Sequence, residues 1–121
     1  ARHGFDHAVC TKQRQGDHAV EIELPALPVA GRAVVLMDDV ASTGHTVAQA
    51  ARRLRAAGAV SVDVAVTHAL LSDDAFGQLR AAGVDAFWST DCVAHPSNVV
   101  KMAVPLAQAL ATLLPGGTAK A

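Results

Sequence analysis

Two adjacent carboxylates, Asp38 and Asp39, directly follow the apolar run at residues 33–37. Such a run is typical of a buried strand of a parallel sheet. Two neighbouring carboxylates at the end of a buried strand repel each other and lose hydration unless something engages them. Sugar hydroxyls or a hydrated metal ion would do so, and the sequence therefore predicts a polar ligand at this point.

The five residues that lead from these carboxylates into the next helix have the types that bind an anion. They are Ser42, Thr43, Gly44, His45 and Thr46. Backbone N–H groups at a helix N-terminus are free to bind a negative group, and a glycine there allows close approach. Together the carboxylates and the loop fit a sugar phosphate. The alternative is that Ser42 or Thr43 only caps the helix and that the carboxylates only form a turn. The glycine-rich motifs of other phosphate loops, GxxxxGK[ST] and GxGxxG, are absent.

The elements that must position these residues alternate between strand and helix. Apolar patterning predicts strands at residues 5–12, 18–24, 33–37, 60–67, 84–88 and 98–104, and helices at 46–57, 73–82 and 105–114. This order predicts an α/β fold, a mostly parallel sheet with helices on both faces, in one domain over residues 1–114. Ligands of such sheets lie beyond the carboxyl ends of the strands. Residues 115–121 are expected to form a disordered tail.

Composition narrows the function classes. Ten Lys and Arg against eleven Asp and Glu give a net charge of −1, and aromatic residues make up 3% of the chain. Both values argue against a nucleic-acid partner. No apolar run is long enough for a membrane span, and Cys10 and Cys92 form no CxxC pair. We therefore expect a cytoplasmic protein with reduced cysteines. The chain opens without a Met and reads like the interior of a longer protein.

The segment at residues 34–46 resembles the phosphoribosyl diphosphate (PRPP) motif of type I phosphoribosyltransferase folds. Further segments resemble the ribose-phosphate pyrophosphokinase, or PRPP synthetase, family in particular. Residues 8–14 resemble the strand that enters its catalytic loop, residues 66–72 a strand that ends in Thr-His, and residues 89–91 with 101–107 its last strand and closing helix. The resemblance covers residues 5–114 and implies the C-terminal half of a two-domain chain.

The resemblance implies a transferase that moves pyrophosphate from ATP to ribose 5-phosphate, giving PRPP and AMP, with Mg²⁺ as cofactor. Asp38 and Asp39 would hold the ribose 2- and 3-hydroxyls, and the loop from Ser42 to Thr46 would bind the 5-phosphate. Lys12 and Arg14 would be the catalytic cations on the transferred group. Residues i and i+2 of a strand share a face, so these two cations point the same way; the alternative is a solvated surface pair. No side chain is assigned as a direct metal ligand, although Asp38 and Asp39 could hold a metal through water.

The chain departs from the family pattern in three residues and in length. Gln13 replaces a usual Arg, Ser42 a frequent Asp, and His45 a common Gly. The family's N-terminal domain, which supplies part of the ATP site, is missing. We therefore expect a fragment that is inactive alone and forms a homo-oligomer in its complete form. The alternatives are a non-catalytic ribose-phosphate-binding module and a fragment of another phosphoribosyltransferase. His68 has two interpretations as well, a histidine at the edge of the core or one that reaches the site.

Overall fold

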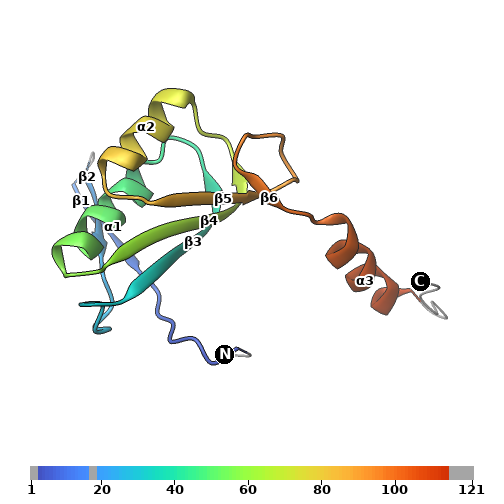
Figure 1. The fold of residues 1–121 in the computed structure, drawn as a ribbon, viewed down its shortest axis with the longest axis horizontal. Coiled ribbons are helices and arrows are strands. Elements are labelled where there is room, and N and C mark those ends of the chain that lie inside the picture. Colours follow the sequence, from blue (N-terminus) through green and yellow to red (C-terminus); the bar gives the residue numbers. More distant parts are fainter. Residues whose placement is uncertain (1–2, 17–18, 115–121) are drawn as a thin grey trace.

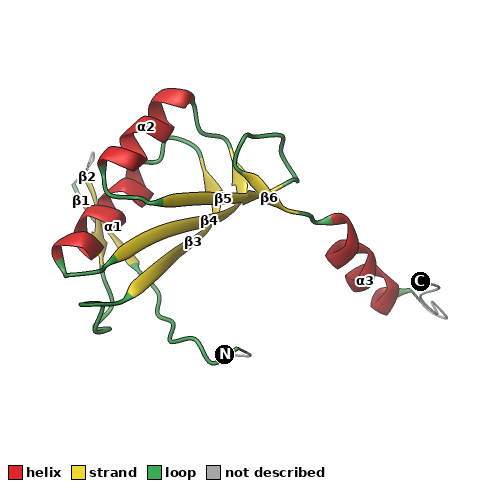
Figure 2. Ribbon diagram, in the orientation of Figure 1, coloured by secondary structure: helices red, strands yellow, loops and turns green. Residues whose placement is uncertain are grey.

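The computed structural model describes residues 3–16 and 19–114, so the tail expected at residues 115–121 lies outside the described residues. The described residues form two sheets and three helices, whose arrangement Figures 1 and 2 show. A two-stranded antiparallel sheet comprises β1 (Thr11–Gln15) and β2 (Ala19–Glu23). A four-stranded parallel sheet, in the order β3-β4-β5-β6, comprises β3 (Ala33–Ala41), β4 (Ser61–Ala69), β5 (Ala86–Thr90) and β6 (Asn98–Val100). The helices are α1 (His45–Ala56), α2 (Asp73–Ala81) and α3 (Ala103–Leu113).

The expected α/β class and the parallel sheet are confirmed, but the expectation of helices on both faces is wrong for the two packed helices. α1 and α2 lie side by side on one face (Figure 1), where they bury Val62, Val64 and Val66 of β4. Val35 and Met37 of β3 remain 50% and 82% exposed. The reason is topological. β3, β4 and β5 are added in one direction across the sheet, and right-handed crossovers then place both helices on the same face.

α3 stands apart from this core. It leaves β6 and projects away from the sheet (Figure 1), and none of its residues is buried. The strand expected to reach residue 104 ends at Val100, and the helix begins at Ala103 rather than at Pro105. Pro105 thus falls in the first helical turn, where its missing N–H removes no intrahelical hydrogen bond.

The core of the packed layer is built from small and branched aliphatic side chains. Ala51 of α1, Val62 of β4 and Leu79 of α2 are each at most 1% exposed. A small residue such as Ala51 lets the helix approach the sheet closely, so that the methyl groups of neighbouring elements make contact. At the edge of this core, the rings of Phe76 and Phe87 pack edge to face with their centroids 5.5 Å apart.

The side chain of one arginine forms hydrogen bonds that link three segments at the amino end of the sheet. Arg55, in the last turn of α1, donates from Nε to the Gly83 carbonyl at 3.0 Å and from Nη1 to the Val60 carbonyl at 2.8 Å. Its Nη2 lies 2.5 Å from Oδ2 of Asp85, which also accepts the backbone N–H of Val62. The end of α1, the start of β4 and the turn before β5 therefore share one polar cluster.

We expect Arg55→Met to lower the free energy of unfolding by about 1–3 kcal/mol, because the aliphatic stem is kept while the carbonyls of Gly83 and Val60 and the carboxylate of Asp85 lose their donor. Urea denaturation of the purified chain measures this change. Arg52→Met is the matched control, since Arg52 is exposed on the same helix and donates no hydrogen bond within the described residues; its effect should stay within about 0.5 kcal/mol. Equal losses in both variants would contradict the role given to the cluster.

Candidate functional site

The strand that carries the two carboxylates is longer than the apolar run indicates. β3 continues through Asp38 and Asp39 to Ala41, four residues beyond the end expected from the sequence. Backbone pairing with β4 explains the extension, since Asp38 pairs with Val66, and the Ala41 carbonyl accepts the N–H of Leu70 at 2.8 Å. The carboxylates therefore sit on hydrogen-bonded strand rather than in a turn, which excludes the turn alternative.

Each carboxylate is oriented by the backbone N–H that follows it. Oδ1 of Asp38 accepts from Asp39 N at 2.9 Å, and Oδ1 of Asp39 accepts from Val40 N at 2.8 Å. The second oxygen of each carboxylate makes no hydrogen bond with any described residue. Asp38 is half-buried and Asp39 exposed. Two free oxygens are thus available to accept hydroxyl groups or to meet a hydrated cation.

The helix after the loop begins without a side-chain cap. α1 starts at His45, one residue earlier than expected, and its N-cap is Gly44 with no side-chain hydrogen bond. Within the described residues, the nearest substitute is a long contact of 3.4 Å between the His45 N–H and Oγ1 of Thr43. The first turn also carries no acidic residue. Most N–H groups of this turn are therefore free for an anion, and the alternative that Ser42 or Thr43 merely caps the helix is wrong.

Gly44 is required by the packing of the loop as well as by its backbone. It adopts a φ of +77°, and an added Cβ would lie 3.3 Å from Cδ2 of Leu71 and 3.4 Å from Leu79. Leu71 belongs to the connection after β4, and Leu79 to α2. Sequence reasoning assigned this glycine to the close approach of a ligand. The structure adds that α2 and its preceding connection press against the loop from the protein side.

The two cations expected to be catalytic lie on the other sheet. Lys12 and Arg14 both belong to β1, although the strand was expected to end at residue 12, and both are exposed. The register pairs them with Ile22 and Val20 of β2. Neither cation makes an ion pair or hydrogen bond within the described residues, and β1 has its residue contacts with β2. The structure therefore does not bring Lys12 and Arg14 into contact with the carboxylates or the loop.

The hairpin that carries these cations is held to the domain through β2. Ile22 is 2% exposed, and Glu21 forms an ion pair with Arg53 of α1. The strand expected at residues 5–12 begins only at Thr11, because β2 offers five residues as partners and these pair with Thr11–Gln15. Just before β1, burial raises the pKa of the Cys10 thiol, which disfavours the reactive thiolate.

One residue near the site, His68, has two interpretations from the sequence alone. His68 lies in β4, opposite Val40 of β3, at the carboxyl end of both strands. Its Nδ1 is buried and has no hydrogen-bond partner among the described residues. The Thr-His ending of this strand was the only signal in the sequence, and it gave no indication of the buried nitrogen.

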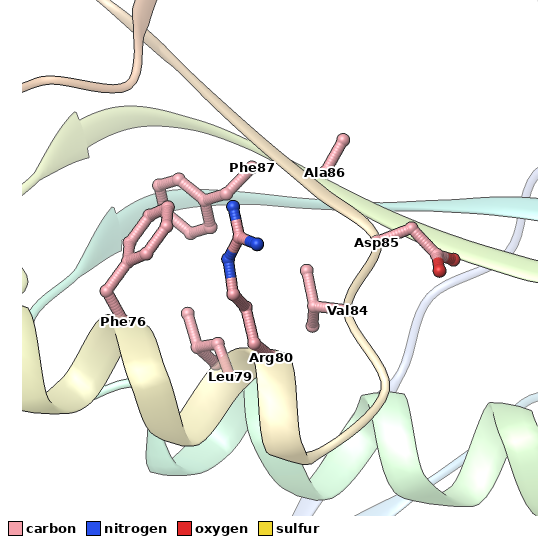
Figure 3. Close-up of a pocket in the computed structure, with 7 residues that line it drawn as sticks. All are labelled: Phe76, Leu79, Arg80, Val84, Asp85, Ala86 and Phe87. Carbon is pink, nitrogen blue, oxygen red and sulfur yellow. The ribbon is translucent and has the colours of Figure 1, made fainter.

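One small cavity in the described part of the chain lies away from the carboxylates and the loop. The hollow in Figure 3, lined by Phe76, Arg80 and Phe87 among others, measures about 10 Å³, enough for about one water molecule. It also includes Ala86, the first residue of β5, and so lies at the opposite end of that strand from its carboxyl end. Within the described residues, no group of three or more His, Cys, Asp or Glu could hold a metal ion. No described helix is long and apolar enough to span a bilayer.

Several known proteins are similar to this chain over most of its length. A ribose-phosphate pyrophosphokinase of Methanopyrus kandleri is 42% identical over 109 residues, covering 90% of this chain and 37% of that protein. One of Methanosarcina acetivorans is 39% identical over 113 residues, covering 93% and 40%. The crystal structure of phosphoribosylpyrophosphate synthetase from Mycobacterium smegmatis superposes with a TM-score of 0.60 and 27% identity, covering 86% of this chain and 36% of that one.

The extent of the matches shows how much of the relatives this chain represents and which family it belongs to. The chain spans at most 40% of the length of the relatives named here. The family model described as phosphoribosyl synthetase-associated domain matches residues 22–111, from β2 to near the end of α3. Since that match takes in most of the chain and the whole of the parallel sheet, the chain belongs to the phosphoribosyl synthetase-associated domain family.

Proposed function

We propose that this chain is the C-terminal part of a ribose-phosphate pyrophosphokinase and binds ribose 5-phosphate. The observation that carries the proposal is the pairing of two free carboxylate oxygens at the end of β3 with the uncapped N-terminus of α1. Carboxylate oxygens accept hydrogen bonds from vicinal hydroxyls, and free N–H groups at a helix N-terminus donate hydrogen bonds to a phosphate. The similarity to proteins named ribose-phosphate pyrophosphokinase supports the same choice.

In the proposed reaction, the oxygen of the sugar's anomeric hydroxyl attacks the β-phosphorus of ATP and loses its proton. The bond between this phosphorus and the oxygen that bridges to the α-phosphate breaks, and PRPP, AMP and a proton result. Asp38 and Asp39 orient the sugar through its 2- and 3-hydroxyls, and the loop from Ser42 to Thr46 fixes the 5-phosphate. Lys12 and Arg14 stabilise negative charge on the transferred group, since phosphoryl transfer depends mainly on positioning and charge. Both cations are exposed on β1 and unpaired within the described residues, which leaves them available for this role.

Mg²⁺ fits this site as a partly hydrated ion. The free oxygens of Asp38 and Asp39 are suitable ligands, while the described residues offer no third protein ligand. Mg²⁺ in proteins commonly keeps several waters and binds one or two carboxylates together with substrate oxygens. When bound, the ion would neutralise charge on the polyphosphate. The carboxylates of this chain would hold it, directly or through water, beside the sugar hydroxyls.

The rest of the proposed enzyme lies outside this chain. The relatives are more than twice as long as the segment that matches, and we propose that an N-terminal domain and neighbouring subunits supply most of the ATP contacts. The chain alone would then bind ribose 5-phosphate weakly and would not turn it over.

A second candidate function is a ribose-phosphate-binding regulatory module without catalysis. Two observations favour it. The matching family model is described as an associated domain, and Lys12 and Arg14 lie on a sheet of their own, without contact to the loop. A module that only binds the sugar phosphate does not need a pair of cations for a transferred pyrophosphate, and this difference can be measured.

We expect Asp38→Asn to weaken the binding of ribose 5-phosphate by more than tenfold, about 1.4 kcal/mol. The substitution keeps the size of the side chain but removes the charge that orients the sugar hydroxyls. Isothermal titration calorimetry with Mg²⁺ present measures the dissociation constant. Asp74→Asn is the matched control, because Asp74 is exposed on α2 and loses the same charge. Absence of binding to the wild-type chain, or an equal effect of both variants, would contradict the proposal.

The two candidate functions differ in the ligand that Lys12 and Arg14 contact. For the pyrophosphokinase, we expect the double variant Lys12→Gln, Arg14→Gln to bind ribose 5-phosphate within about twofold of the wild type. Its affinity for PRPP, which carries the transferred pyrophosphate, should fall about tenfold because two charged contacts are lost. Competition titrations with both ligands test this, with Arg52→Gln as the charge control. Unchanged affinity for PRPP would favour the regulatory module.

A further inference from the structure

His68 combines three features that no structural role explains together. It lies in β4 two residues beyond Val66, the partner of Asp38, and thus about 7 Å farther toward the carboxyl edge of the sheet. Its Nδ1 is buried without a hydrogen-bond partner among the described residues, while the residue as a whole is only half-buried. A buried polar atom that stays unpaired lowers stability, and such atoms in folded proteins call for an explanation.

The buried nitrogen indicates which nitrogen of the ring carries the proton. A neutral imidazole has one N–H donor and one acceptor nitrogen. An unpaired N–H is rarer in protein interiors than an unpaired acceptor. Nδ1 is therefore best assigned as the unprotonated nitrogen, and Nε2 as the donor. Nε2 is not among the buried unpaired atoms and makes no hydrogen bond with a described residue, so its N–H is free to donate to a hydrogen-bond acceptor.

The neighbours of His68 are those of the sugar-phosphate site. Its register partner is Val40, whose N–H orients the carboxylate of Asp39. Two residues later along the chain, the N–H of Leu70 binds the Ala41 carbonyl at the end of β3, and the following Leu71 packs against Gly44 of the loop. The strand end that holds His68 is therefore joined by direct contacts to both halves of the proposed site.

We propose that His68 is a further ligand-binding residue of this site, and that its Nε2–H donates a hydrogen bond to an oxygen of the bound ribose phosphate. The inference rests on the proposed function, because it takes the same ligand. This hydrogen bond explains why a histidine that lowers the stability of the free chain is present here, since the contact forms only when the ligand is bound. Such an exchange of stability for binding is common at functional sites.

Three substitutions of His68 distinguish a role in ligand binding from a role in packing. His68→Gln keeps an N–H donor close to the position of Nε2, His68→Asn keeps one close to Nδ1, and His68→Leu keeps neither. By calorimetry with Mg²⁺, we expect His68→Gln to bind ribose 5-phosphate within about threefold of the wild type. His68→Asn and His68→Leu should each bind about tenfold more weakly. In urea denaturation, His68→Leu should have a midpoint at or above that of the wild type, because the unpaired buried nitrogen is gone.

The outcomes distinguish this inference from the proposal on which it rests. If the wild-type chain does not bind ribose 5-phosphate, both fail. If the wild type binds and Asp38→Asn weakens binding while His68→Leu binds normally, only the inference on His68 is overturned. It is also overturned if His68→Leu lowers the unfolding midpoint together with the affinity, or if His68→Gln binds no better than His68→Asn, because a packing role would explain both results.

Discussion

Parallel backbone pairing between β3 and β4 is the interaction on which the site depends. The register runs from Ala33 with Ser61 to Ala41 with Ala69 and continues past the apolar part of β3. It carries Asp38 and Asp39 as part of a hydrogen-bonded strand and brings the ends of two strands to one edge. Without this pairing, the two carboxylates would not be held beside the carboxyl end of β4.

Packing of α2 against the loop supplies the second constraint. Gly44 lies against Leu71 and Leu79, so the N-terminus of α1 is set by side chains from the following crossover. The loop contributes few interactions of its own, since no side chain in the described part of the chain caps the helix. Its conformation is therefore maintained from outside, while its N–H groups stay free. Packing of these five residues against α2 and the preceding connection stabilises the fold, while their backbone N–H groups remain available to bind a ligand.

Much of this arrangement could be predicted from the sequence, because apolar runs and glycines mark the elements directly. The order of strands and helices, the parallel sheet and the placement of the loop before α1 follow from such local patterns. The single-sided packing of α1 and α2 could not, since it depends on the direction in which strands are added to the sheet. The burial of Nδ1 of His68 depends on neighbours distant in sequence. The separate sheet of Lys12 and Arg14 depends on β2, which a pattern within β1 does not reveal.

The bare helix α3 has a consequence for dynamics. It has eleven residues, and none of them is buried. An isolated helix of this length is only marginally stable in water, because nucleation costs more than a few hydrogen bonds return. Its amide hydrogens should therefore exchange with solvent far faster than those of β4, whose alternate side chains are sealed beneath two helices. In this chain, α3 therefore stays helical only to the extent that another surface packs against it.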